Sequence, residues 1–216
     1  MISMEILDSR EAWRANRLKG IGGSEAAAIV GMNPYMTNQE LWQIKRGLYE
    51  PEDISEKPYV KYGTEAEMPL RELFKLDYPH LQVDYVDNNS WTNDDYPWAL
   101  ASLDGWLTDQ EGRSGILEIK TTEILQSSQK EKWKDKIPDN YYCQLLHYMA
   151  VTDAKFAILK AQLKTEFGGV PYLQIKHYPI ERDEVEDDIK YLMQKEKEFW
   201  QCVQTGRKPA LILPEL

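Results

Sequence analysis

The stretch "ASLDGWLTDQEGRSGILEIKTT", residues 101–122, places three charged residues beside two apolar runs. Asp104 follows the first run, and Glu118 and Lys120 stand two positions apart in the second. Successive side chains of a strand point to opposite faces, so Glu118 and Lys120 project together, away from their apolar neighbours. Charges near a core are costly unless they are paired or bind an ion. The stretch therefore predicts neighbouring strands that carry a charged site.

The spacing D-x13-E-x-K is that of a metal-dependent nuclease site. Asp104 and Glu118 can share one divalent cation, and the backbone carbonyl of Ile119 can be a further ligand. Lys120 can orient or deprotonate the attacking water, while the ion generates hydroxide and stabilises the pentacoordinate phosphate. Oxygen ligands favour Mg²⁺ or Mn²⁺. Alone the pattern is weak, because such spacings arise by chance in a charged sequence.

Length and composition set the class of protein. The chain of 216 residues is long enough for one sizeable α/β domain over residues 1–216, and no Pro/Gly/Ser-rich linker divides it. Cys143 and Cys202 are the only cysteines, which suits a reducing cytoplasm and provides neither a disulfide framework nor a zinc site. The apolar runs are too short to span a bilayer, and the N-terminus lacks the apolar core of a signal peptide.

The charge is unevenly distributed along the chain. A net charge of −10 argues against general coating of nucleic acid. Residues 10–19 and 130–136 are nevertheless basic, so an acidic chain can still present a basic groove. The alternative is that each cluster is an ordinary solvated face.

Hydrophobic periodicity and capping signals predict a central mixed β-sheet flanked by helices. The first helix is expected to be capped by Asp8 or Ser9, and Thr37 with Glu40 forms a capping box for the third. The first three strands are expected to be antiparallel. Helices are expected over 8–17, 24–31, 37–47, 60–77, 138–151 and 181–206, and strands over 81–86, 98–109, 115–122, 154–163 and 172–180.

Further polar residues fit the same site. Glu65 and Glu67 lie early in a helix, where a carboxylate could bind a second ion or its water shell. Two ions about 4 Å apart would clamp an in-line displacement. The alternative is a surface glutamate favoured by the helix dipole. The amide of Gln144 could hold a water or a phosphate oxygen, although a helical glutamine can equally be solvated.

Several motifs occur together in one order across nearly the whole chain, and the set is more specific than any member. In this respect the chain resembles the phage lambda-type exonucleases of the YqaJ-like viral recombinase branch, within the PD-(D/E)XK superfamily. Leu103 departs from the proline that the superfamily name implies, at a variable position. The matching segments are RLKGIGGSEAAAIVG with Arg17 and Ser24 at R-x6-S spacing, YGTEAEMPLRELF with Glu67 rather than Glu65, ASLDG with Asp104, LEIKT with Glu118 and Lys120, and YYCQLLHYMAVT with Tyr141 and Gln144.

The resemblance implies a restriction-endonuclease-like core and a Mg²⁺-dependent 5′→3′ exonuclease. Such an enzyme resects linear double-stranded DNA and leaves 3′ overhangs for a phage single-strand annealing protein. It would act in the cytoplasm of a bacterial host, encoded by a phage or prophage, as a homo-oligomer that is a closed ring in some relatives. The implied catalytic residues are Asp104, Glu118, Lys120, Glu67 and Gln144; the DNA-binding residues are Arg17, Ser24 and Tyr141; the ligands of two ions are Asp104, Glu118, the Ile119 carbonyl and Glu67.

In that family the R-x6-S pair grips the 5′ phosphate. Ser24 follows a glycine-rich turn at an expected helix N-terminus, where free N–H groups attract phosphate, and Arg17 can add a bidentate contact. Ser24 can instead be an N-cap, or serve both roles. Trp106 and Tyr35 could stack on a terminal base, whereas most other aromatic residues are expected in the core.

Two other functions remain open from the sequence. A restriction or repair endonuclease would keep Asp104, Glu118 and Lys120 but would not need the Arg17 and Ser24 pocket. A non-enzymatic DNA-binding relative is disfavoured by the intact set of polar residues, because decay usually removes one of them first.

Overall fold

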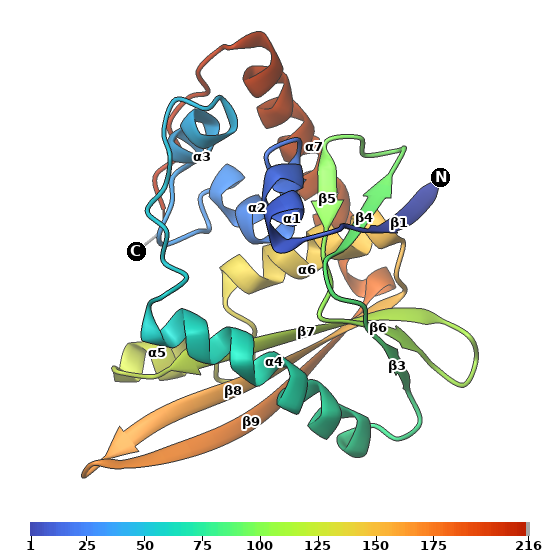
Figure 1. The fold of residues 1–216 in the computed structure, drawn as a ribbon, viewed down its shortest axis with the longest axis vertical. Coiled ribbons are helices and arrows are strands. Elements are labelled where there is room, and N and C mark those ends of the chain that lie inside the picture. The colour runs from blue at the N-terminus through green and yellow to red at the C-terminus, as the bar shows by residue number, and fades with distance from the viewer. Residues whose placement is uncertain (215–216) are drawn as a thin grey trace.

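The computed structural model describes residues 1–214 and has two mixed β-sheets with helices around them (Figure 1). The smaller sheet has the strand order β1-β4-β5-β2, and the larger has the order β3-β6-β7-β8-β9. The first comprises β1 (Ile2–Ile6), β4 (Asn89–Asn93), β5 (Ala99–Ala101) and β2 (Ile21–Gly22); the second comprises β3 (Gln82–Asp84), β6 (Gly105–Thr108), β7 (Ser114–Glu123), β8 (Phe156–Phe167) and β9 (Val170–Glu181).

Helices cover both faces of the larger sheet. On one face, Leu70 and Phe74 of α4 pack on Leu117 and Ile119 of β7. On the other, α6 packs between the two sheets (Figure 1). Each fully buried large apolar side chain contributes about 1.5–3 kcal/mol of burial free energy. The helices are α1 (Arg10–Arg17), α2 (Gly23–Ile29), α3 (Asn38–Lys45), α4 (Pro58–Asp77), α5 (Ser127–Lys132), α6 (Asp139–Thr152) and α7 (Arg182–Thr205).

The larger sheet contains both antiparallel and parallel pairs, which confirms the predicted mixed α/β class. β3, β6 and β7 are antiparallel neighbours as expected. β7 then runs parallel to β8, and the connection between them contains α6, as parallel pairing requires. β8 and β9 form a long hairpin closed by Gly168 and Gly169, both at positive φ, as the turn between twisted strands demands.

The expected single strand over 98–109 is wrong. It is two strands, β5 and β6, that belong to different sheets. The side chain of Asn89 accepts from the Leu103 N–H at 2.8 Å and donates to the Leu103 carbonyl at 3.0 Å. These bonds replace ladder bonds, so the chain can leave one sheet and enter the other. Asp104 therefore lies in the break before β6 rather than at the end of one strand.

The sequence reading also missed β1, β2, β4 and α5. The helix caps were clearer. Ser9 rather than Asp8 caps α1, because its hydroxyl accepts from the Ala12 N–H, and Thr37 with Glu40 forms the predicted capping box. No helix within residues 1–214 is long and apolar enough to cross a membrane.

Candidate active site

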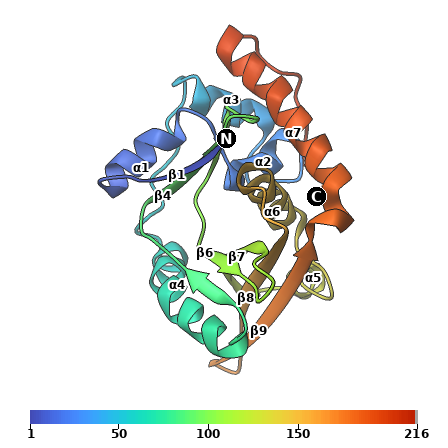
Figure 2. The same ribbon diagram turned by 90° about the vertical axis from the view of Figure 1, so that its right-hand side faces the viewer.

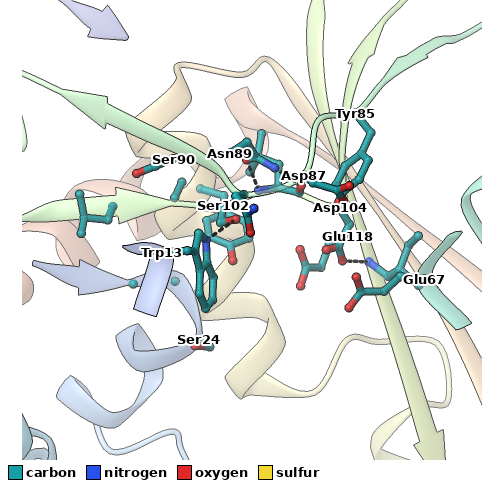
Figure 3. Close-up of a pocket in the computed structure, with 18 of the residues that line it drawn as sticks. Trp13, Ser24, Glu67, Tyr85, Asp87, Asn89, Ser90, Ser102, Asp104 and Glu118 are labelled. Atoms are coloured by element: carbon teal, nitrogen blue, oxygen red, sulfur yellow. Dashed lines mark hydrogen bonds between the residues drawn. The ribbon is translucent and has the colours of Figure 1, made fainter. Parts of the chain in front are cut away.

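A cavity of about 850 Å³ opens between α1 and α2 on one side and α4 on the other. Figure 2 shows α1 and α4 on the same side of the molecule, with the larger sheet beside α4. The break between β5 and β6 and the start of the polar face of β7 complete the cavity wall. Figure 3 shows Glu67, Asp104 and Glu118 gathered at one end, with Trp13 and Ser24 at the other.

Asp104 is fixed in place through both its backbone and its side chain. Its Oδ2 accepts a hydrogen bond of 2.8 Å from the backbone N–H of Ile119, which joins it to β7. Its carbonyl accepts from Nε of Arg71 on α4 at 2.6 Å. Burial raises the pKa of Asp104 above its usual value, more than the charges of Lys120 and Arg71 lower it. The free carboxylate is therefore a costly group that a cation would stabilise.

Glu118 points toward Asp104 from the polar face of β7. Its Oε1 lies 2.6 Å from Nζ of Lys120 and accepts a hydrogen bond of 2.6 Å from Nε2 of Gln144. Its Oε2 is buried and has no hydrogen-bond partner among the described residues. Burial first, and then the negative charge of Asp104, raise the pKa of Glu118 to about 8, even beside Lys120.

Glu67 and Lys120 bring opposite charges to the same end of the cavity. Burial and the charge of Asp104 raise the pKa of Glu67 to about 7. Burial alone would lower the pKa of Lys120, but Glu118 and Asp104 more than offset this and raise it above the usual value. Lys120 is therefore a permanent cation among carboxylates that resist ionisation.

The donor set fits a divalent cation that keeps part of its water shell. The unpartnered Oε2 of Glu118 and the mutual repulsion of the carboxylates are both features that a bound cation would relieve. Within residues 1–214, no group of three or more Asp, Glu, His or Cys side chains could hold an ion. Mg²⁺ often binds through one or two carboxylates and retains several waters, so it does not require such a group.

The family to which the chain belongs follows from comparison with known proteins. Residues 12–155 match the model of the YqaJ-like viral recombinase domain. The chain belongs to this family. The "Uncharacterized protein YqaJ" of Bacillus subtilis (strain 168) is 31% identical over 207 residues, and the match covers 94% of this chain. The chain spans 59% of the length of that relative.

Solved structures show that this YqaJ-like domain has the fold of several exonucleases. The alkaline exonuclease LHK-Exo from Laribacter hongkongensis is 20% identical, with a TM-score of 0.68 over 91% of this chain and 94% of that one. The LHK-Exo complex with dAMP is 21% identical, with a TM-score of 0.62 over 91% and 96%. A phage related exonuclease from Haemophilus somnus 129PT is 14% identical, with a TM-score of 0.58 over 87% and 96%. These likenesses confirm the expected PD-(D/E)XK fold class.

At the other end of the cavity of the YqaJ-like domain, Nη2 of Arg17 donates a 2.8 Å hydrogen bond to Oγ of Ser24. The two side chains that the R-x6-S spacing singled out are thus neighbours. Ser24 is not the N-cap of α2, because Gly22 occupies that position. The Gly22 N–H is already bonded to Oε2 of Glu25 at 2.8 Å. The N-terminus of the short α2 therefore has fewer free N–H donors for an anion than expected. The side chains of Arg17 and Ser24 are the more important donors.

Three aromatic residues considered for DNA contact lie outside the cavity lining. Tyr141 packs on Trp133 with ring centroids 5.5 Å apart, and Nζ of Lys120 lies 5.2 Å from its ring. Trp106 stacks on Trp91 at 4.8 Å. Tyr35 is 87% exposed in the loop after α2. Their proposed contacts with DNA stay predictions.

Trp13 and Arg71 are among the lining residues that the sequence reading missed. Trp13 lies against the guanidinium groups of Arg10, at 3.9 Å, and Arg17, at 5.0 Å, and its Nε1 donates to Oγ of Ser102 at 3.1 Å. The signal was the W-x3-R spacing, which places Trp13 and Arg17 on one face of a helix. Arg71 has the same i, i+4 relation to Glu67 on α4 and is 5% exposed.

Glu67 and Glu65 form a matched pair for mutation. Glu67→Gln should lower nuclease activity by about a hundredfold, because a carboxylate beside Asp104 would lose its charge. Glu65→Gln should leave it unchanged, because Glu65 is exposed and outside the cavity lining. Initial rates on linear duplex DNA test both. The reverse result would place the functional glutamate two positions earlier.

Proposed function

We propose that residues 1–216 form a single nuclease domain that digests linear double-stranded DNA from its ends, in the 5′→3′ direction and with Mg²⁺. The observation that carries the proposal is one cavity with a carboxylate and lysine cluster at one end and the Arg17–Ser24 pair at the other. The first end suits hydrolysis of a phosphodiester, and the second suits a terminal phosphate. Membership of a viral recombinase family and a fold shared with exonucleases support this combination.

Each residue has a defined task in this proposal. Asp104, Glu118 and the carbonyl of Ile119 would hold one Mg²⁺ or Mn²⁺, and Glu67 would hold a second ion or its water shell. When bound, such an ion supplies hydroxide near neutral pH and stabilises charge on the phosphate. Lys120, fixed 2.6 Å from Glu118, orients the attacking water and counters the phosphate charge.

Gln144 and Arg71 fix the positions of Glu118 and Asp104, respectively. The Gln144 amide occupies Oε1 of Glu118 and leaves Oε2 free to face a ligand. Arg71 ties Asp104 to α4, the helix that carries Glu67. The carboxylates are thus held by groups that do not themselves react, which keeps their geometry ready before substrate arrives.

The wider function follows from the polarity of digestion. Removal of the 5′-ended strand leaves a 3′ overhang, which a phage single-strand annealing protein could pair with a complementary strand. The reaction would take place in the bacterial cytoplasm. A homo-oligomer, ring-shaped or not, would help the acidic chain stay on DNA, with the basic residues 130–136 as a further contact.

A DNA endonuclease is the second candidate, since it needs only the carboxylates and Lys120. The presence of the Arg17–Ser24 pair in the same cavity favours the exonuclease. Linear and circular forms of one plasmid separate the two when each is incubated with Mg²⁺ or with EDTA. We expect digestion of the linear form alone, only with Mg²⁺. Cleavage of the circle would favour the endonuclease, and no cleavage of either form would favour a non-enzymatic relative.

Arg17 should act through the terminal phosphate. Arg17→Ala should lower the rate on 5′-phosphorylated ends by about tenfold, the size of one charge-assisted hydrogen bond, and should change the rate on 5′-hydroxyl ends much less. Arg14→Ala is the control, because Arg14 is on the same helix but outside the cavity lining. The measurement is the initial rate on both end types. Equal rates on both ends in the wild type would refute the phosphate pocket.

A further inference from the structure

A buried lysine lies behind the proposed phosphate pocket. The side chain of Lys45 on α3 is completely buried, and its Nζ lies 2.7 Å from Oε2 of Glu25. The same Nζ donates to the backbone carbonyl of Arg17 at 2.7 Å. Neither Lys45 nor Glu25 lines the cavity. Lys45 thus joins the end of α1 to the start of α2, just beneath the Arg17–Ser24 pair.

Glu25 is a potential competitor for Arg17. Its Oε1 lies only 3.8 Å from Nη2 of Arg17, whereas its Oε2 is occupied by Lys45 and by the Gly22 N–H. Nη2 of Arg17 meanwhile makes its short contact, 2.8 Å, with Ser24. The Glu25 side chain is 15% exposed, so water screens its charge poorly. A phosphate at Arg17 would face this carboxylate unless another cation compensated for it.

We propose that Lys45 is a positioning residue that neutralises Glu25 and so leaves Arg17 available for a terminal phosphate. The inference rests on the proposed function of the Arg17–Ser24 pair and adds a residue that selects 5′-phosphorylated ends. With Lys45 present, Arg17, Lys45 and Glu25 together carry one net positive charge. Without it, Arg17 and Glu25 cancel, and the carboxylate has Arg17 as its nearest remaining cation.

A merely structural ion pair would behave differently from this arrangement. If Lys45 served only to hold α3 against α2, its loss would lower thermal stability and slow both end types alike. In our proposal the loss changes the ratio of rates on phosphorylated and hydroxyl ends. It does so through the charge of Glu25, so removal of that charge should restore the ratio.

The test compares wild type, Lys45→Met and Lys45→Met with Glu25→Gln on one linear duplex with either 5′ end. Lys45→Met should lower the phosphate-to-hydroxyl rate ratio by about tenfold, and the double variant should return it to within about twofold of wild type. A single variant with the wild-type ratio, or a double variant that is not restored, would overturn the proposal.

Two further measurements keep these outcomes distinct. Lys45→Gln retains a donor for the Arg17 carbonyl without the charge. It should lower the phosphate-to-hydroxyl rate ratio as much as Lys45→Met does. If the ratio in Lys45→Gln equals that of wild type, the role of the charge is refuted. Lys45→Gln also serves if Lys45→Met fails to fold, as judged by thermal unfolding. By contrast, if the wild-type enzyme digests both end types at equal rates, the phosphate pocket itself is refuted, and the inference with it.

Discussion

Replacing Glu118 with glutamine should lower the rate of DNA hydrolysis by about three orders of magnitude. The variant keeps the shape of the side chain and an oxygen for Gln144 but loses the charge that would hold the ion. Initial rates on linear duplex DNA at saturating Mg²⁺ measure the effect. Asp104→Asn should be equally inactive, since it can keep the bond to the Ile119 N–H without the charge. Glu111→Gln, an exposed change in the adjoining hairpin, should be active.

Glu118→Gln, which should lower activity, should instead raise the stability of the metal-free protein near neutral pH. Because the folded-state pKa of Glu118 is about 8 and the usual value for glutamate is lower, the folded chain holds this proton more tightly than the unfolded chain. The contribution of this group to stability is therefore lost as the pH rises toward 8. Glu118→Gln should make thermal unfolding less dependent on pH between about 5 and 8. If Glu118→Gln cleaves DNA as fast as wild type, the proposed metal site is refuted.

Lys120→Met should slow hydrolysis by about a hundredfold or more while leaving metal binding intact. Lys120 is not a ligand, and its loss removes a cation that competes with the ion for Glu118. Titration calorimetry with Mn²⁺ on the metal-free protein should give an affinity equal to or higher than that of wild type. Lys164→Met, a change at a more exposed lysine on β8, is the control. Loss of Mn²⁺ binding in Lys120→Met would show that the lysine organises the ligands instead.

The strand β7 could be predicted from sequence because its signal is local. The alternation in residues 115–122 places Leu117 and Ile119 against α4 and Glu118 with Lys120 in the cavity, and the structure confirms this. The spacing of Arg17 and Ser24 likewise brings two side chains together, across the short segment that contains β2. Glu67 could be separated from Glu65 only through the family motif, since both positions are helical and acidic.

The rest depends on partners distant in sequence. β1 alternates apolar and polar residues over only five positions and is exposed along its whole length, so its pairing with β4 is what defines it as a strand. The break between β5 and β6 depends on Asn89, which lies 14 residues before Leu103. The surroundings of Trp106 and Tyr141 depend on Trp91 and Trp133, which no local pattern couples to them. Long-range packing therefore limited the prediction of both the second sheet and the aromatic contacts.

The crossing of the chain between two sheets at Asp104 also bears on how the protein matures. Asp104 lies between β5, which belongs to one sheet, and β6, which belongs to the other, so its position depends on both sheets. Glu67, Glu118 and Gln144 come from three further elements, so the cavity depends on contacts of high sequence separation. Such contacts close late because loop entropy opposes them. If the proposed function holds, a nascent or partly folded chain would lack the carboxylate and lysine cluster and could not yet cut DNA.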